Sequence, residues 1–328
     1  MNKFKYYFIL IITTFSLFSC SKNNDASEIT PPRDFAVQYA TDITNIEEYL
    51  KTYYITVVDH AGFVDDQDVT YTKITDAANQ PSIYSYLNAS TFPKLLSREV
   101  KLHDITYKVY YLVLREGTGA APCNVDGVLA AYKGDYLEQT VTSNVTSLTA
   151  TTFEVAKYPQ QMLSLYSTIT GWSEIFPQFK TGSYTANNDG TVSYSDFGAG
   201  VMFIPSGLAY YSAGSASIPA YAPLIFSFKL YEINRQDQDS DGIPSYLEDK
   251  NGDGYVKVLA TGVENADDTD KDGIPDFLDV DDDADGYSTK LEITAANGTI
   301  IPFADIPSCD GDTTDPARLK KHLDKSCH

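Results

Sequence analysis

The chain has 328 residues, of which 43% are hydrophobic, which is enough for the core of one or two domains. Its formal net charge of −21 argues against nucleic-acid binding, which requires a basic face. The four histidines and four cysteines are scattered along the chain, so neither a zinc cluster nor histidine-based catalysis is indicated.

The N-terminus has the pattern of an export signal. Residues 1–20 begin with Lys3 and Lys5, continue with an apolar run that is short for a membrane span, and end in Leu-Phe-Ser-Cys. This ending resembles a bacterial lipobox, whose cysteine is lipidated and becomes the first residue after cleavage. The resemblance implies lipidation of Cys20, a polar tether over 21–34, and a membrane-anchored lipoprotein of the bacterial cell envelope. We expect the outer membrane, on its periplasmic or surface face; an ordinary secretory signal peptide is the alternative.

Residues 35–103 form an N-terminal extension in which one element is clear. Phe35, Tyr39, Ile43, Ile46 and Leu50 recur at helical spacing, which predicts an amphipathic helix. Residues 60–100 indicate only loops and short strands.

From residue 104 onward, the pattern changes to alternation of apolar and polar residues. Strands are predicted within 105–119, 127–137, 151–159, 192–206 and 222–234, with a hairpin tip at the Asn-Asp-Gly of 188–190. Residues 169–182 contain the one good candidate for a short helix, which Pro177 should shorten. Residues 104–235 therefore predict an α+β domain in which an antiparallel sheet surrounds a short helix.

Beyond Asn234, Asp and Gly replace the hydrophobic periodicity, which marks a boundary before an acidic tail over 236–328. Residues 237–292 contain 18 acidic side chains and 4 lysines. Three segments repeat the spacing of a calcium loop, with acids at positions 1, 3, 5 and 12 around a Gly at position 6. A fourth, starting at Asp249, has Ala260 at position 12. The predicted metal ligands are Asp237, Asp239, Asp241, Glu248, Asp268, Asp270, Asp272, Asp279, Asp281, Asp283, Asp285 and Glu292.

All-oxygen ligation favours Ca²⁺ over zinc or copper. Because flanking helix patterns are absent, the tail resembles the calcium-binding repeats of thrombospondin type 3, which implies a loop-rich, calcium-bound tail acting as a spacer. A solvated acidic linker is the alternative. Cys309 and Cys327 lie where a disulfide would stabilise an exported segment with little core. Cys123 is expected to be a small buried hydrophobic residue.

The segments REGTGAAP, GVLAAYKG, TTFEV, TITGW, FKTG, IPSGLAYYSAG and SIPAYAPLIFSFKL follow one another between residues 115 and 230. In this order they resemble the FKBP-type peptidyl-prolyl cis-trans isomerases over residues 104–235. The resemblance implies a sheet that curls around a short helix, with a shallow apolar pocket whose floor is Trp172 and whose hydrogen-bond donor is Tyr210. The implied site residues are Tyr132, Phe153, Ile169, Trp172, Tyr210, Ile218 and Phe226.

Such a site needs no cofactor and no charged catalytic group. Rotation about an X-Pro bond loses amide resonance against a barrier of about 20 kcal/mol, and no proton must be transferred. An apolar pocket can desolvate the imide and bind the twisted form better than the planar form. The resemblance therefore implies a folding helper, or chaperone, for proline-containing segments of exported proteins.

The chain departs from the family pattern at three places. The family's Phe-Asp pair aligns with Val141-Thr142, which would remove a polar contact near the bound carbonyl. Pro177 interrupts the helix, and Tyr211 stands where the family commonly has Gly. Two alternatives therefore stay open: a catalytically silent FKBP-like module that binds peptides or proteins, and a calcium-braced adhesion or scaffold protein of the cell surface.

Overall fold

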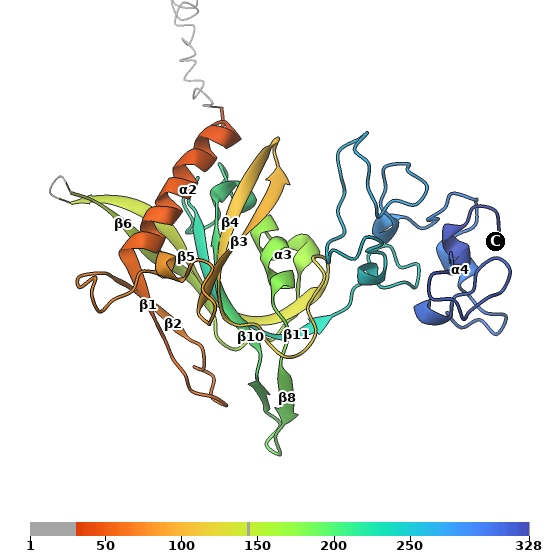
Figure 1. Cartoon of the computed structure of the whole chain (residues 1–328), viewed down its shortest axis with the longest axis horizontal. Coiled ribbons are helices and arrows are strands. Elements are labelled where there is room, and N and C mark those ends of the chain that lie inside the picture. Colours follow the sequence, from red (N-terminus) through yellow and green to blue (C-terminus); the bar gives the residue numbers. More distant parts are fainter. Residues whose placement is uncertain (1–30, 143–144, 328) are drawn as a thin grey trace, which may run out of the picture. The chain divides into compact units, whose positions relative to one another are not determined.

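The computed structural model shown in Figure 1 describes residues 31–142 and 145–327. It contains a main sheet whose strands agree with the alternation of apolar and polar residues in the sequence. The predicted signal peptide, Cys20 and most of the tether lie outside the described residues. The main sheet has seven strands in the order β3-β4-β10-β11-β5-β6, with β7 paired to β5, and every pairing is antiparallel. Its strands are β3 (Lys94–Leu102), β4 (Ile105–Arg115), β5 (Gly127–Thr142), β6 (Val145–Ala156), β7 (Leu163–Ser164), β10 (Gly198–Ile204) and β11 (Leu224–Asn234).

The predicted N-terminal helix is confirmed as α2 (Phe35–Thr52). Its first turn is capped by Asp34, whose carboxylate accepts hydrogen bonds from the backbone amides of Ala36 and Val37. The second predicted helix is α3 (Thr170–Ile175), which continues as the 3₁₀ turn η3 (Phe176–Gln178) containing Pro177. Because proline has no N–H to continue the α-helical bonding, α3 is short, as predicted.

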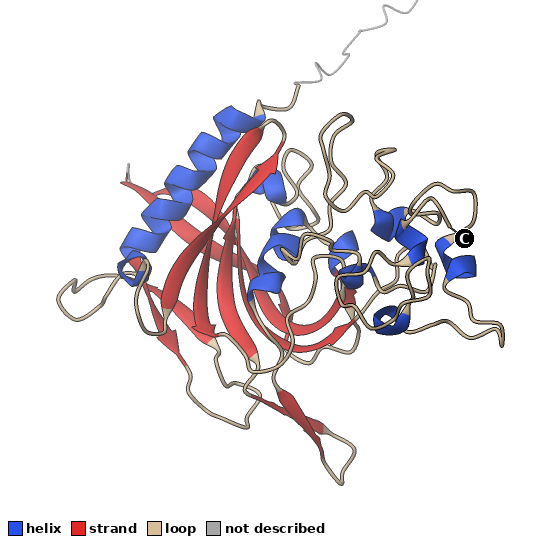
Figure 2. Ribbon diagram, turned by 45° about the vertical axis from the view of Figure 1, so that its right-hand side comes forward, coloured by secondary structure: helices blue, strands red, loops and turns tan. Residues whose placement is uncertain are grey.

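The two helices cover opposite faces of the curled sheet (Figure 2), which explains why β10 is buried along its whole length. Met202 and Ile204 of β10 pack with Trp172 of α3 in one core. Val201 and Phe203, which alternate with them, pack with residues of α2 in a second core. An α+β class, with an antiparallel sheet around a short helix, is thus confirmed.

The main sheet begins before residue 104, where the sequence analysis expects the domain to start. Strand β3 lies at the edge of the main sheet and pairs along its length with β4, so the sheet begins at Lys94. Strand β3 was not predicted because its polar and apolar residues are mixed. An edge strand keeps more of its side chains exposed, so its sequence need not alternate. From Asp34 onward, the extension, sheet and tail form one compact unit.

Two small sheets and eight 3₁₀ turns complete the described elements. The sheets pair β1 (Tyr53–Val57) with β2 (Val69–Lys73), and β8 (Ser183–Ala186) with β9 (Val192–Ser195). The single strand expected over 192–206 is broken between β9 and β10, where Asp196 has a φ of 53°. The remaining turns are η1 (Ile83–Tyr86), η2 (Leu165–Ser167), η4 (Ser206–Leu208), η5 (Ser245–Leu247), η6 (Asp276–Leu278), η7 (Phe303–Asp305) and η8 (Lys321–Leu323).

The acidic tail has little regular structure. Its only described α-helix is the four-residue α4 (Thr289–Glu292), and its apolar residues form two small clusters rather than one core. In one of them, Ile243 of the first acidic repeat packs with Ile293, which follows the third. Within the described part of the chain, no helix has both the length and the apolar character needed to cross a membrane.

Candidate functional site

Eleven uncharged residues and one acid surround a cavity of about 510 Å³ beside helix α3. Glu154 is the only charged side chain among its lining residues. The cavity is lined by Tyr132, Phe153, Glu154, Leu163, Ser167, Thr168, Ile169, Thr170, Trp172, Ala209, Tyr210 and Phe226. Six of the seven predicted site residues are therefore brought together; Ile218 is the exception.

Trp172 occupies the first turn of α3, where its backbone amide bonds to the carbonyl of Ile169 at 2.9 Å. Its indole is 4% exposed and meets Tyr132 and Phe226 edge-on, with centroid distances of 5.0 and 5.1 Å. The preceding Gly171 lies against Ile204, which a β-carbon would approach to 2.5 Å. The Gly-Trp dipeptide thus reflects a close approach of helix to sheet, with the indole placed at the cavity.

A β-bulge places Phe153 in the cavity. Gly134 pairs with Glu154 and Asp135 pairs with Thr152, so Phe153 is the extra residue between them. Its ring meets Phe226 edge-on at 5.6 Å and lies against Gly134, where a β-carbon would come within 2.5 Å of it. Gly134 is therefore the residue that gives the aromatic ring its space.

Glu154, the next residue, is a site residue that the sequence analysis missed. Burial, the nearby Glu154 carboxylate and a hydrogen bond to it raise the pKa of Tyr132 to about 12. The pKa of Tyr210 is also raised, by burial and by Glu154. An acid thus lies beside two tyrosines of the cavity, directly after a phenylalanine.

The sequence analysis places the family's Phe-Asp pair at Val141-Thr142, at the end of β5. Val141 is 67% exposed near the end of the long β5–β6 hairpin and does not line the cavity. The aromatic–acid pair at the cavity is Phe153-Glu154. Both residues lie on β6, after the turn of the hairpin, and Glu154 provides the cavity with an acid.

Ile218 and Tyr211 also differ from expectation. Ile218 is buried in the same core as Trp172 but does not line the cavity. Tyr211 has a φ of 44°, a left-handed conformation that glycine adopts most easily. Its ring stacks on Phe35 of α2 at 4.2 Å rather than lining the cavity, so it does not narrow the opening.

Helix α2 holds the loop that carries Tyr210. Asp42 is fully buried, and one of its oxygens accepts hydrogen bonds from the amide and hydroxyl of Ser206, at 2.8 and 2.6 Å. Its other oxygen accepts a bond from the Gln38 side chain at 2.6 Å. Ser206 begins η4, which leads directly to Tyr210. The N-terminal extension therefore supports one edge of the cavity.

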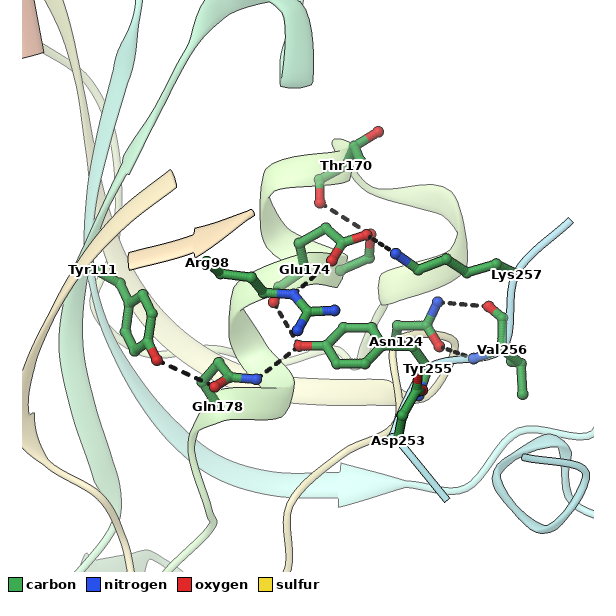
Figure 3. A network of polar contacts seen from close by, with 11 residues as sticks. Arg98, Tyr111, Asn124, Thr170, Glu174, Gln178, Asp253, Tyr255, Val256 and Lys257 are labelled. Atoms are coloured by element: carbon green, nitrogen blue, oxygen red, sulfur yellow. Dashed lines mark hydrogen bonds and ion pairs between the residues drawn. The ribbon is translucent and has the colours of Figure 1, made fainter. Parts of the chain in front are cut away.

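The acidic tail contacts the other side of the same site through Glu174 of α3, as Figure 3 shows. Glu174 is 4% exposed, and its carboxylate pairs with Arg98 at 2.8 Å and with Lys257 at 2.6 Å. The Tyr255 hydroxyl donates to the Glu174 backbone carbonyl at 2.7 Å and accepts a bond from Gln178 at 2.9 Å. The tail is thus fixed to the helix that carries Trp172.

A second contact between the tail and the sheet domain lies beside the Glu174 contacts (Figure 3). Asn124, in the connection between β4 and β5, exchanges two hydrogen bonds with the backbone of Val256, at 2.8 and 2.9 Å. Cys123 next to it is buried, as predicted, and burial raises its thiol pKa to about 11. This cysteine is therefore a protonated packing residue at neutral pH.

Positions 1, 3 and 5 of all three predicted calcium loops converge. In each loop the three aspartates bring carboxylate oxygens within 4.8 Å of one another. Such spacing fits a shared cation, since calcium–oxygen distances are about 2.3–2.6 Å. These groups are Asp237 with Asp239 and Asp241, Asp268 with Asp270 and Asp272, and Asp281 with Asp283 and Asp285.

The closing acids at position 12 are less uniform. Burial and the carboxylates of Asp272 and Asp270 raise the pKa of Asp279, and burial with Asp283 and Asp285 raises that of Glu292 to about 8. Glu248 instead groups with Asp241 and with Asp282, a residue that the spacing did not single out. The structure also joins Cys309 to Cys327 in a disulfide, with the α-carbons 5.7 Å apart.

The family match found for this chain lies in the acidic tail and does not include the sheet. The family described as BamM C-terminal matches residues 238–316, which lie in the acidic tail. No curated protein matches the chain.

Solved structures similar to the chain include FKBP-type isomerases at low identity. One is a peptidyl-prolyl cis-trans isomerase from Pseudomonas syringae pv. tomato, with 15% identity, a TM-score of 0.33, and coverage of 63% of this chain and 100% of that chain. FkpA from Escherichia coli has 26% identity and a TM-score of 0.28, over 38% of this chain and 48% of that chain. The match therefore spans about half of FkpA.

Proposed function

We propose that the chain is a peptidyl-prolyl cis-trans isomerase that binds X-Pro segments of exported proteins in the cavity at α3. The observation that carries this proposal is the cavity itself, with four aromatic walls and a single acid. Tyr132, Phe153, Trp172 and Phe226 meet edge-on around it. A proline ring is a compact apolar group that such a set of rings can enclose.

The cavity supplies what the reaction needs. Isomerisation breaks no bond, and the barrier falls when the twisted imide binds better than the planar one. The planar imide carries more charge separation, so transfer into an aromatic cavity disfavours it relative to the twisted form. Tyr210, 37% exposed at the cavity edge, would donate a hydrogen bond to the peptide backbone. Glu154 would fix the hydroxyl of Tyr132 and offer a polar contact near the bound carbonyl.

The proposal is tested by proline-limited refolding of an unrelated protein in the presence of the chain from residue 21 onward. We expect the slow phase to accelerate in proportion to chain concentration. Tyr210→Phe removes only the donor and should reduce the acceleration several-fold, whereas Tyr184→Phe, on the exposed β8, should not. Peptide binding without acceleration would identify the silent FKBP-like module, and neither binding nor acceleration would favour the scaffold alternative.

We also propose that the tail holds structural Ca²⁺ and that Cys20 is lipidated, tethering the domain to the envelope membrane. The residues of the tail fit the ion: its buried carboxylates include oxygens of Asp239, Asp241 and Asp283 that have no hydrogen-bond partner. Calcium would be structural, with no part in isomerisation. Labelling with a fatty-acid analogue in bacteria tests the anchor: Cys20→Ser should abolish the label, and retained label would refute the proposal.

A further inference from the structure

One group of acids in the tail belongs to no single predicted loop. Asp241 is position 5 of the first repeat, Glu248 follows η5 in that repeat, and Asp282 is position 2 of the third. Oxygens from these three carboxylates lie within 4.8 Å of one another. The loop spacing assigns no role to position 2, so Asp282 is not a ligand that the repeat pattern accounts for.

All three side chains are deeply buried. Asp241 and Asp282 are 2% exposed and Glu248 is 4% exposed. Both oxygens of Glu248, both of Asp282 and one of Asp241 lack a hydrogen-bond partner in the described residues. Isolated carboxylates are very costly to bury unless a cation or donor compensates them. None of the ion pairs of the described residues involves Glu248 or Asp282.

The first and third repeats are brought together by contacts that do not involve these acids. Ile243 and Ile293 share one apolar cluster, and Lys290 of α4 donates to the carbonyl of Ser240 at 2.9 Å. Packing of the repeats therefore forces three carboxylates into one small buried space, and the cost of doing so requires an explanation.

From this geometry we propose a further cation site, formed by Asp241, Glu248 and Asp282, that links the first repeat to the third. It takes a hard divalent cation of calcium type, because all its ligands are carboxylate oxygens. Asp241 bridges this ion and that of the first loop. The site rests on the proposed calcium function of the tail but differs from it in joining two repeats.

The test counts calcium ions per chain after equilibrium dialysis of the metal-stripped chain against Ca²⁺. Asp282→Asn, which keeps the shape of the side chain, should lose one ion relative to the unchanged chain. Glu248→Gln combined with Asp282→Asn should lose no more than that, because both residues hold the same ion. Asp305→Asn is the control, since Asp305 is exposed and outside every acidic group, and it should lose none.

Thermal unfolding gives a second readout that a purely structural residue would not produce. In chelator, Asp282→Asn should raise the melting temperature, because it removes a carboxyl group that is costly to bury beside other acids without a cation. In calcium the same substitution should lower the melting temperature, because it removes a ligand. An unchanged ion count in Asp282→Asn, or a shift of the same sign in both conditions, overturns the inter-repeat site while leaving the loops intact. A chain that binds no calcium at all overturns the calcium function itself.

Discussion

The hydroxyl of Tyr255, in the acidic tail, donates a hydrogen bond of 2.7 Å to the backbone carbonyl of Glu174 in helix α3. Glu174 lies two residues after Trp172, whose indole lines the cavity. The Arg98 guanidinium stacks on the Tyr255 ring at 3.6 Å and pairs with the Glu174 carboxylate. The tail therefore contributes directly to holding the helix on which the site depends.

Tyr255→Phe should reduce the free energy of unfolding by about 1–2 kcal/mol, because it leaves a buried carbonyl without its donor. Denaturant titration followed by the fluorescence of Trp172, the only tryptophan, measures this loss of stability at helix α3. Tyr184→Phe, at an exposed position, is the matched control. Equal stability of the two variants would show that the tail contact does not support α3.

Asp42 should position the cavity edge through Ser206. Asp42→Ala leaves the buried amide and hydroxyl of Ser206 unpaired, so we expect a loss of about 3 kcal/mol in stability. In an isomerase assay KM should rise more than kcat falls, because Tyr210 loses its fixed position. Asp42→Asn keeps one acceptor oxygen and should recover part of the loss. Glu48→Ala, on the exposed side of α2, should change neither quantity.

Glu154→Gln should lower the pKa of Tyr132 from about 12 toward the ordinary tyrosine value of 10.0, while burial keeps it raised. Nuclear magnetic resonance of ¹³C-labelled tyrosine as a function of pH measures this change. The same substitution should reduce kcat/KM about tenfold, which corresponds to about 1.4 kcal/mol. Glu99→Gln on the exposed edge strand is the control. Unchanged titration would place Glu154 outside the site.

Metal removal should make the tail sensitive to alkali. Burial and neighbouring carboxylates raise the pKa of Glu248 to about 11 and that of Asp282 to about 10. Because these pKa values lie above those of an unfolded chain, about 4, the metal-free tail is most stable below pH 4 and loses stability progressively up to about pH 11. Hydrogen exchange in chelator should be faster at pH 8 than at pH 5, after correction for intrinsic rates. Slower exchange at pH 8 would contradict this.

Much of the fold could be predicted because local signals agree with the final packing. Helix α2 follows from apolar spacing, and the shortness of α3 follows from Pro177. Trp172 and Phe226 were found because each lies inside a short motif whose neighbours are close in sequence. Edge strand β3 was missed, since a half-exposed strand with mixed polarity has no clear period.

The missed residues depend on contacts between distant segments. Glu154 reaches the cavity through a bulge beyond a hairpin of unusual length, so its position could not be read by counting from Gly134. Asp42 looks like an ordinary polar residue of an amphipathic helix until its partner Ser206, 164 residues away, is known. Asp282 gains its neighbours only when two repeats pack together. An acid next to the TTF motif was the one signal that could have identified Glu154.

The central claim is that the cavity at α3 isomerises X-Pro bonds. It is tested most directly by exchange spectroscopy of a tetrapeptide with one Ala-Pro bond, with and without the chain from residue 21 onward. Uncatalysed exchange takes about 10–100 s at 25 °C. We predict that the exchange rate rises with the concentration of the chain. With the Glu154→Gln variant, the rise per unit of concentration should be about tenfold smaller. An exchange rate that stays at the uncatalysed value at every concentration would contradict the claim.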